Sequence, residues 1–211
     1  MKRLKKLGSI VLTACLALGL MGCGSSGSNT ASANTDSTKS AASSSAELAQ
    51  TIPDAMKGKK VLVAYYSWSG HTKAVAEQIS SETGGTLFEI QPAVPYPTDY
   101  RECVDVAKKE MQDNARPAVA STVDNMDQYD VIFVGYPIWW GKAPMHVYTF
   151  LESYSLSGKV IVPFCTSGGS PLSGSIPDLQ KAVPGAQVVQ GSQSTDPAKI
   201  SQWLKDIHAV S

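Results

Sequence analysis

Apolar residues in this chain gather in short continuous runs. The three longest runs occupy residues 61–66, 131–135 and 159–165, and shorter ones occupy 86–90 and 187–189. A strand covered on one face alternates apolar and polar residues, whereas a strand buried on both faces of a parallel sheet is apolar throughout. The runs therefore predict five strands, and the three longest are expected to be buried on both faces.

Segments with helical spacing separate these runs. They are residues 72–82, 100–113, 145–154, 174–182 and 197–208. Because strand and helix alternate along the chain, the pattern predicts an α/β fold with a doubly wound parallel sheet and helices on both faces. Sheets of this kind bind ligands at the carboxyl ends of their strands.

One segment interrupts the alternation. Residues 91–126 contain four prolines around a single helix, which is long for a connection between a strand and the next. Connections of this size are usually functional or mobile. The alternative is a surface excursion that packs over the edge of the sheet.

The N-terminal residues are typical of a processing signal. Four basic residues precede an apolar run at 10–21, which is too short to span a membrane. The run ends in Leu20-Met21-Gly22-Cys23, which resembles the lipobox of bacterial lipoproteins. This resemblance implies a signal peptide over residues 1–22 and a lipid on Cys23, which would anchor the exported protein to the outer face of the cytoplasmic membrane. An ordinary cleaved secretory signal is the alternative.

Composition divides the rest of the chain. Residues 23–52 are mostly Ser, Ala, Gly, Thr and Asn and predict a flexible linker. Residues 53–211 are enough for one domain, and they carry 13 Lys and Arg against 16 Asp and Glu, a net charge of −3. Nothing in this balance indicates nucleic-acid binding.

Cysteines and histidines offer little chemistry of their own. Beyond the signal and Cys23, only Cys103 and Cys165 remain, so at most one disulfide can form. Cys165 ends a strand before a glycine-rich turn, but a nucleophile needs a positioned base, and a buried thiol is the favoured interpretation. No two histidines or cysteines have the spacing of metal ligands.

Polar residues follow the first strand at a helix start. The stretch Ser67-Trp68-Ser69-Gly70-His71-Thr72 offers hydroxyl donors, a glycine and the free N–H groups of the helix. It predicts a phosphate cradle, although Ser69 could instead simply cap the helix. The nucleoside-triphosphate and dinucleotide motifs are both missing, so a monophosphate fits the loop best.

Two further loops follow strands. Residues 135–145 hold Tyr136, Trp139 and Trp140, which indicate walls for a flat aromatic ligand unless one or both tryptophans fill the core. Residues 166–171 hold Gly168 and Gly169, which permit close approach to a ligand edge or form a simple turn. All three loops are expected at one edge of the sheet.

These loops resemble those of short-chain flavodoxins. The resemblance rests on YYSWSGHTK, NARPA (residues 114–118), GYPIWWGKAPM and FCTSGGS, and it implies a five-stranded sheet in the order 2-1-3-4-5 with FMN as cofactor. Three residues depart from the usual pattern: Ser69 stands for threonine, His71 stands for asparagine, and Trp68 is unusual at its position. The FMN-binding residues implied are Ser67, Trp68, Ser69, Gly70, His71, Thr72, Pro137, Ile138, Trp139, Trp140, Gly141, Thr166, Ser167, Gly168 and Gly169.

Several functions follow from bound FMN. A flavodoxin-like electron carrier needs only an exposed ring edge, whereas an FMN-dependent NAD(P)H:quinone or nitro-group oxidoreductase needs a substrate pocket as well. A non-flavin binding module is the third alternative, and the redox partner is not identifiable. Residues 136–145 and 166–176 contain no Asp or Glu, while Lys142 adds positive charge. We therefore expect a flavin less strongly reducing than in flavodoxins with acidic loops.

Overall fold

The computed structural model describes residues 48–53, 56 and 58–210. The strands are β1 (Val61–Tyr65), β2 (Thr86–Glu89), β3 (Val131–Pro137), β4 (Val160–Thr166) and β5 (Gln187–Val188). The α-helices are α1 (His71–Thr83), α2 (Tyr100–Gln112), α3 (Met145–Glu152), α4 (Ile176–Ala182) and α5 (Pro197–Asp206). Short 3-10 turns occur at Met126–Gln128 and Leu172–Gly174.

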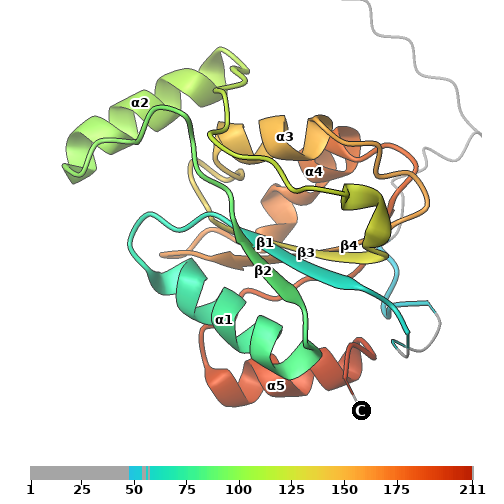
Figure 1. The fold of residues 1–211 in the computed structure, drawn as a ribbon. Helices are drawn as coiled ribbons and strands as arrows, with labels where there is room; N and C mark the ends of the chain where they lie inside the picture. Colours follow the sequence, from blue (N-terminus) through green and yellow to red (C-terminus); the bar gives the residue numbers. More distant parts are fainter. Residues whose placement is uncertain (1–47, 54–55, 57, 211) are drawn as a thin grey trace, which may run out of the picture. The chain divides into compact units, whose positions relative to one another are not determined.

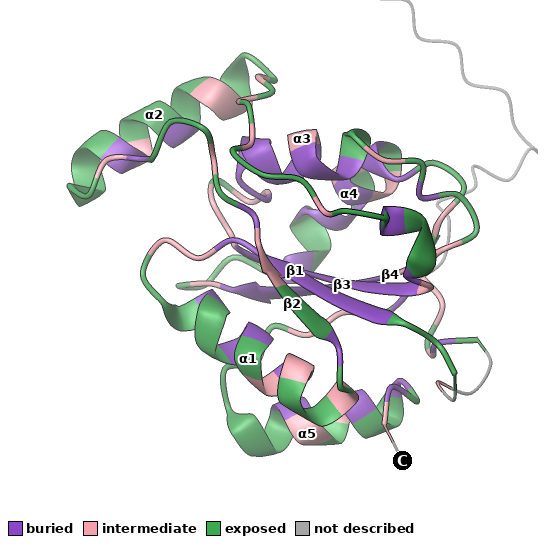
Figure 2. Cartoon of the chain, viewed as in Figure 1, coloured by how far each residue is buried: buried purple, intermediate pink, exposed green. Residues whose placement is uncertain are grey.

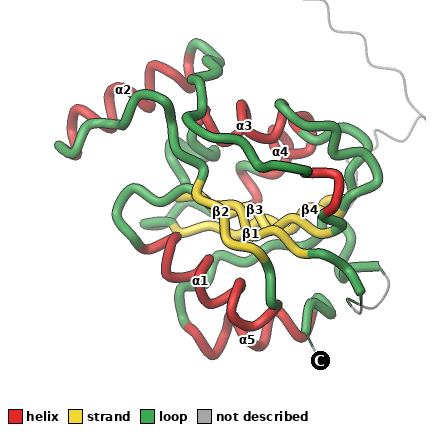
Figure 3. The backbone as a smooth tube through the Cα atoms, in the orientation of Figure 1, coloured by secondary structure: helices red, strands yellow, loops and turns green. Residues whose placement is uncertain are grey.

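The strands form one parallel sheet in the order β2-β1-β3-β4-β5 (Figures 1 and 3). Strand order and fold class are as predicted from the sequence. In Figure 1, α1 and α5 lie below the sheet and α3 and α4 above it. The three layers explain why β1 and β3 are apolar along their whole length, since both faces of each strand are covered (Figure 2).

Alternate residues of β1 enter two separate cores. Leu62 and Ala64 lie in the core shared with α3 and α4, whereas Val61 and Val63 lie in the core shared with α1 and α5. This alternation follows from the twofold period of a strand, whose successive side chains point to opposite faces. The sheet is thereby fixed in register from both sides.

Helix α1 ends at two consecutive glycines, Gly84 and Gly85, and each has a structural role. Gly84 has φ of 69°, a left-handed conformation that ends helices and favours glycine. A Cβ on Gly85 would lie 2.8 Å from a side-chain carbon of Val61, so the second glycine permits the close packing of the turn against β1. The pair returns the chain directly to the edge strand β2.

Several boundaries differ from the sequence prediction. The fourth helix begins at Ile176 after a 3-10 turn, and the third ends at Glu152. Ordered structure also begins before residue 53, because Ala49 pairs with Val189 and the backbone N–H of Ile52 donates to the carbonyl of Ile207 at 2.9 Å. The predicted signal peptide and Cys23 lie outside the described residues. Within the part of the chain that is described, no helix is both long and apolar enough to cross a membrane.

Candidate functional site

The β1–α1 loop leaves the start of α1 uncapped by any side chain. The N-cap is Gly70 at φ of 88°, and no described side chain accepts a hydrogen bond there. Ser69 is not the cap, since its Oγ lies 2.8 Å from Nδ1 of His71. The first N–H groups of this 13-residue helix therefore face outward without a side-chain acceptor. Together with the helix dipole they favour an anion at this position.

The hydroxyls of this loop have different roles. The Oγ of Ser67 is buried and has no hydrogen-bond partner among the described residues. A buried hydroxyl without a partner costs about 1 to 3 kcal/mol, so its place in the loop needs a reason. Thr72 is only 1% exposed, and its Oγ1 lies 2.8 Å from Oγ1 of Thr166. Thr72 thus ties the first loop to the end of β4, while Ser67 keeps its hydrogen-bonding capacity unused.

The loop after β3 contains a tight two-residue turn. Trp139 and Lys142 exchange two backbone hydrogen bonds of 2.9 Å each, and the residues between them, Trp140 and Gly141, have φ of 50° and 79°. Positive φ at both central positions defines a type I′ turn. A bulky residue at positive φ is a genuine outlier, and strain of this kind clusters at functional sites.

This turn sends the two tryptophans in opposite directions. Trp139 packs inward edge-on against Tyr66 and Tyr96, with ring centroids 5.6 and 4.9 Å apart. Trp140 is 48% exposed, with the ammonium group of Lys108 5.1 Å from the centre of its ring. The sequence left open whether one or both tryptophans fill the core; Trp139 is half-buried and packs against the core on the side of α3 and α4, whereas Trp140 is exposed.

The loop after β4 is open to approach. A Cβ added to Gly168 or Gly169 would meet no atom within 4 Å. The backbone N–H of Ile138 donates to the carbonyl of Thr166 at 2.9 Å, which joins this loop to the one after β3. With the Thr72–Thr166 contact, all three predicted loops are brought to one edge of the sheet.

Helix α2, which belongs to the long segment 91–126, supplies a further wall of the site, although none of its residues was among the predicted site residues. A cavity of about 310 Å³ lies between α2 and the three loops; its lining residues are Trp68, Tyr100, Cys103, Val104, Ala107, Ile138, Trp139, Trp140 and Ser170. The Nε1 of Trp140 donates to the carbonyl of Val104 at 3.3 Å. In Figure 1, α2 lies at the same end of the sheet as the β1–α1 loop, and in Figure 2 it is mainly exposed with buried residues along one side.

A network of hydrogen-bonded side chains lies behind Trp139. The hydroxyl of Tyr96 donates to the Glu110 carboxylate at 2.6 Å and lies 3.2 Å from Nδ1 of His146. Because that hydroxyl proton goes to Glu110, Nδ1 of His146 carries the proton shared with Tyr96. Nε2 of His146 then has a lone pair with no partner among the described residues.

Burial controls the protonation of the side chains in this network. His146 is fully buried, and desolvation lowers its pKa to about 3, which keeps the ring neutral. Desolvation also raises the pKa of Glu110, an effect that the hydrogen bond from Tyr96 partly opposes. The pKa of Tyr96 is raised, first by burial and then by the same carboxylate. The network thus places the half-buried carboxyl group of Glu110 near Trp139, and it contributes no positive charge because His146 is neutral.

The sequence predicted that Lys142 adds positive charge near the loop after β3, but in the structure this charge is compensated. Its ammonium group is ion-paired with the carboxylate of Asp178 on α4, and that pairing lowers the pKa of Asp178. Lys181 contacts the other oxygen of the same carboxylate at 3.4 Å. Residues 136–145 and 166–176 lack carboxylates, but Asp178 comes just after them and compensates Lys142.

Neither cysteine has a catalytic environment. Cys103 and Cys165 are both free and buried, so the bridge considered from the sequence is not formed. Burial raises the pKa of the Cys165 thiol to about 12, which is the opposite of what a nucleophile requires. Among the described residues, no group of three or more His, Cys, Asp or Glu side chains could hold a metal ion.

The wall formed by α2 had a signal in the sequence. Tyr100, Cys103, Val104 and Ala107 recur with spacings of three and four, the pattern of one helix face. That face is short and follows a proline-rich segment, so its direction toward the loops depends on the path of residues 91–99. No pattern in the sequence indicates that path.

Comparisons with known proteins agree on one family. Residues 60–207 match the family model described as Flavodoxin. The chain is 42% identical to a protein of Bacteroides eggerthii with a provisional flavoprotein assignment, over 72% of this chain and 99% of that one, with a TM-score of 0.65. It is 28% identical to a Lactobacillus acidophilus flavoprotein solved in complex with FMN, over 69% of this chain and 98% of that one, with a TM-score of 0.57.

A curated relative has a named activity. An NAD(P)H dehydrogenase (quinone) of Acidovorax ebreus is 27% identical over 117 residues, which are 51% of this chain and 56% of the relative. The chain therefore spans about half the length of the curated relative that it matches.

Proposed function

Because this chain belongs to the flavodoxin family, we propose that it binds FMN at the edge formed by its three loops and acts in electron transfer. The observation that carries the proposal is the β1–α1 loop, where an uncapped helix start and the unpartnered hydroxyl of Ser67 lie together. A phosphate group would supply acceptors to both. The relative solved in complex with FMN supports the same cofactor.

The residues present fit FMN without a basic clamp. The loop residues Ser67, Trp68, Ser69, Gly70 and His71 would surround the phosphate, with Thr72 holding the loop to β4. Backbone N–H groups and hydroxyls bind a phosphate well at a helix start. Lys73 is exposed, and its ammonium group lies 4.0 Å from the carboxylate of Glu77, one turn further along α1.

The flavin ring would lie between the other two loops. Pro137, Ile138, Trp140 and Gly141 would form one side, with Trp139 supporting them from behind. Thr166, Ser167, Gly168 and Gly169 would form the other side, where open glycines allow the backbone to approach the ring edge. When bound, FMN supplies the redox chemistry. The chain orients the ring and keeps water from its buried side.

A second candidate function is an FMN-dependent NAD(P)H:quinone or nitro-group oxidoreductase. The specific observation in its favour is that α2 forms a further wall of the cavity of about 310 Å³ in which the flavin ring would lie, so that a substrate could be enclosed beside the ring. A carrier needs an exposed ring edge and no such wall. The curated relative with quinone dehydrogenase activity supports the same alternative.

Two measurements test these functions. Protein purified with its native cofactor should be yellow with a flavin absorption spectrum, and the released flavin should be FMN. A colourless protein that takes up no FMN would contradict the proposal. Addition of NADH or NADPH without a second protein then separates the candidates, because bleaching within seconds indicates a reductase and a stable yellow colour indicates a carrier.

We also propose that the protein is exported and held at the outer face of the cytoplasmic membrane by a lipid on Cys23. The support is the sequence Leu20-Met21-Gly22-Cys23 after a short apolar run. Stable anchoring requires two or more acyl chains. Cys23→Ala should move the protein to the soluble fraction or leave its precursor unprocessed. An unchanged membrane fraction for this variant would contradict the anchor.

A further inference from the structure

A second cavity opens at the carboxyl ends of β1 and β2, next to the proline-rich segment that precedes α2. Its volume is about 360 Å³, which lies within the size range of small-molecule sites. The lining residues that matter here are Tyr66, Trp68, Glu89, Pro92, Pro95 and Tyr96. Among the described lining residues, only Trp68 is shared with the cavity between α2 and the three loops. The second cavity is therefore a separate candidate site.

Aromatic rings from three places in the chain line this cavity. Tyr66 directly follows β1, Trp68 lies in the β1–α1 loop, and Tyr96 lies in the proline-rich segment. The ring centroids of Tyr66 and Tyr96 are 6.0 Å apart, and both rings are buried and pack against Trp139. The Nε1 of Trp68 donates to the carbonyl of Pro97 at 3.0 Å. The aromatic walls are thus held in place by contacts within the chain.

Glu89 brings a carboxylate without a counter-ion to the same cavity. It is the last residue of β2, is half-buried, and has one weak contact, with Nε2 of Gln91 at 3.5 Å. It forms no ion pair with a described residue, and no described Lys, Arg or His side chain lines the cavity. The pKa of Tyr66 is raised mainly by burial, and Glu110 and Glu89 raise it further. The electrostatic potential at the aromatic walls is therefore negative.

This combination of groups selects the charge and the hydration of a ligand. Glu89 repels an anion, whereas the faces of aromatic rings attract a cation, and more strongly when the cation has lost its water. A single carboxylate supplies too few oxygen ligands for a metal ion. A strongly hydrated simple ion would gain nothing from the apolar walls of Pro92 and Pro95. An alkylated ammonium group fits all of these walls, because its carbon atoms contact the rings and prolines while its charge faces the carboxylate.

We propose that this cavity binds a small organic cation with a quaternary or otherwise alkylated ammonium group. Glu89 would be its counter-ion, and the three aromatic rings would surround its methyl groups. The inference goes beyond the proposed function and does not require bound flavin, because every group that it uses belongs to the chain.

The test is a titration of the intact protein with choline and, separately, with the neutral isostere of choline in which carbon replaces the quaternary nitrogen. Binding is measured at constant ionic strength from the nuclear magnetic resonance signals of the four tryptophan indole N–H groups. Trp68 lines the cavity, whereas Trp203 lies on α5 and is the internal reference. We expect choline to shift the Trp68 signal saturably, to leave Trp203 unchanged, and to bind about tenfold more tightly than its isostere.

Two variants test the role of the carboxylate. Glu89→Gln keeps the shape of the side chain and removes its charge, so choline should then bind about as weakly as its isostere. Glu77→Gln is the matched control, because Glu77 and Glu89 both raise the pKa of Tyr65, but Glu77 does not line the cavity. Since charges outside the site are screened by salt, this control should bind choline within about twofold of wild type.

Equal affinity of wild type for choline and its isostere would overturn the inference, as would the absence of a saturable shift at Trp68. A loss of choline binding in Glu77→Gln as large as that in Glu89→Gln would overturn it too. A protein that bound choline as expected but took up no FMN would contradict the proposed function and leave this inference in place.

Discussion

At the scale of single residues, Ser67→Ala should change FMN binding and stability in different ways. Its hydroxyl is buried without a partner, so Ser67→Ala removes an unsatisfied group from the free protein and should leave the free energy of unfolding unchanged or slightly higher. In the proposed FMN site, the same change would remove a donor to the phosphate, and a hydrogen bond to a charged group is worth about 1.5 to 3 kcal/mol. FMN binding should therefore weaken by about tenfold or more, as measured by fluorescence titration.

The control for Ser67→Ala is Lys73→Ala. Lys73 is exposed on α1, and its variant should bind FMN almost as wild type does. A riboflavin affinity equal to that for FMN would contradict the phosphate assignment altogether.

His146 is the residue whose burial should appear in the pH dependence of stability. Its folded-state pKa is lowered to about 3 from 6.5, so between those pH values the unfolded chain binds about one more proton. Stability that is complete above pH 6.5 is therefore lost as the pH falls, by about 1.4 kcal/mol per pH unit. Urea unfolding at pH 6.5 and 5 should show a loss of about 2 kcal/mol from this group.

His146→Asn should abolish that part of the slope, whatever it does to stability at pH 7. The groups facing His146 are Tyr66 and Tyr96, neither of which titrates in this range. Glu110, one step further, has a raised pKa and so acts in the opposite direction, binding its proton more readily in the folded state. An identical pH slope in wild type and His146→Asn would show that His146 is charged in the folded protein.

At the scale of structural elements, the turn after β3 assigns opposite roles to neighbouring tryptophans. Trp139 packs between Tyr66 and Tyr96, so Trp139→Ala should lower the free energy of unfolding by about 3 kcal/mol. Trp140→Gly relieves positive φ and loses only exposed contacts, and should change stability by less than about 1 kcal/mol.

Trp140→Gly should hardly change stability, but it should lower the affinity for flavin. Loss of its ring should weaken FMN binding by about threefold to tenfold, since an aromatic pair adds about 0.5 to 1.5 kcal/mol. Denaturant unfolding and FMN titration of the two variants measure both effects. Equal FMN affinity in wild type and Trp140→Gly would place the ring away from this turn.

The elements differ in how far the sequence determines them. Strands β1, β3 and β4 were predictable because both faces of each are buried, which leaves a continuous apolar run. The three loops were predictable because parallel strands end at one edge. The inward packing of Trp139 was not, because it depends on the direction of a turn with a strained tryptophan. Nor was the carboxylate of Glu110 beneath Tyr96, which requires α2 to fold back over residues 91–99.

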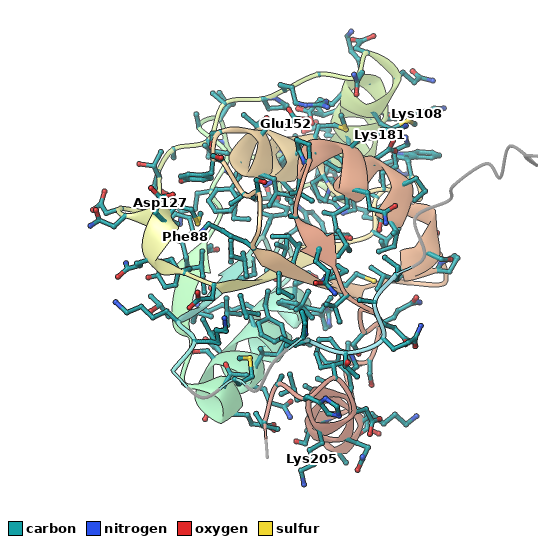
Figure 4. The ribbon with its side chains drawn as sticks, turned by 90° about the vertical axis from the view of Figure 1, so that its right-hand side faces the viewer. Phe88, Lys108, Asp127, Glu152, Lys181 and Lys205 are labelled. Carbon is teal, nitrogen blue, oxygen red and sulfur yellow. The ribbon has the colours of Figure 1, made fainter. Side chains whose placement is uncertain are left out.

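At the scale of the whole molecule, the sheet divides the charges of the two helix layers. Figure 4 shows Glu152 and Lys181 on the layer of α3 and α4, and Lys205 on α5 at the opposite side of the sheet. The layer of α3 and α4 borders the candidate flavin site, where Lys142 forms an ion pair with Asp178 on α4. Charges on α5 are separated from it by the sheet and should have little effect on a bound flavin.

The reduction potential should therefore respond to Asp178 and not to a carboxylate on α5. Reduction adds negative charge at the ring, which a nearby positive charge favours; one charge some 8 Å away is worth about 2 kcal/mol at an effective dielectric of about 20. In the wild type, Asp178 compensates Lys142, so the lysine contributes less than its charge alone implies. Asp178→Asn removes that compensation and should make the potential less negative by some tens of millivolts after screening by solvent. Lys142→Gln should shift it in the opposite direction, and Asp206→Asn, at the end of α5, should leave it unchanged. A spectroscopic redox titration of the three variants with bound FMN decides the matter: equal potentials in wild type and Asp178→Asn would mean that this ion pair lies too far from the ring to influence it.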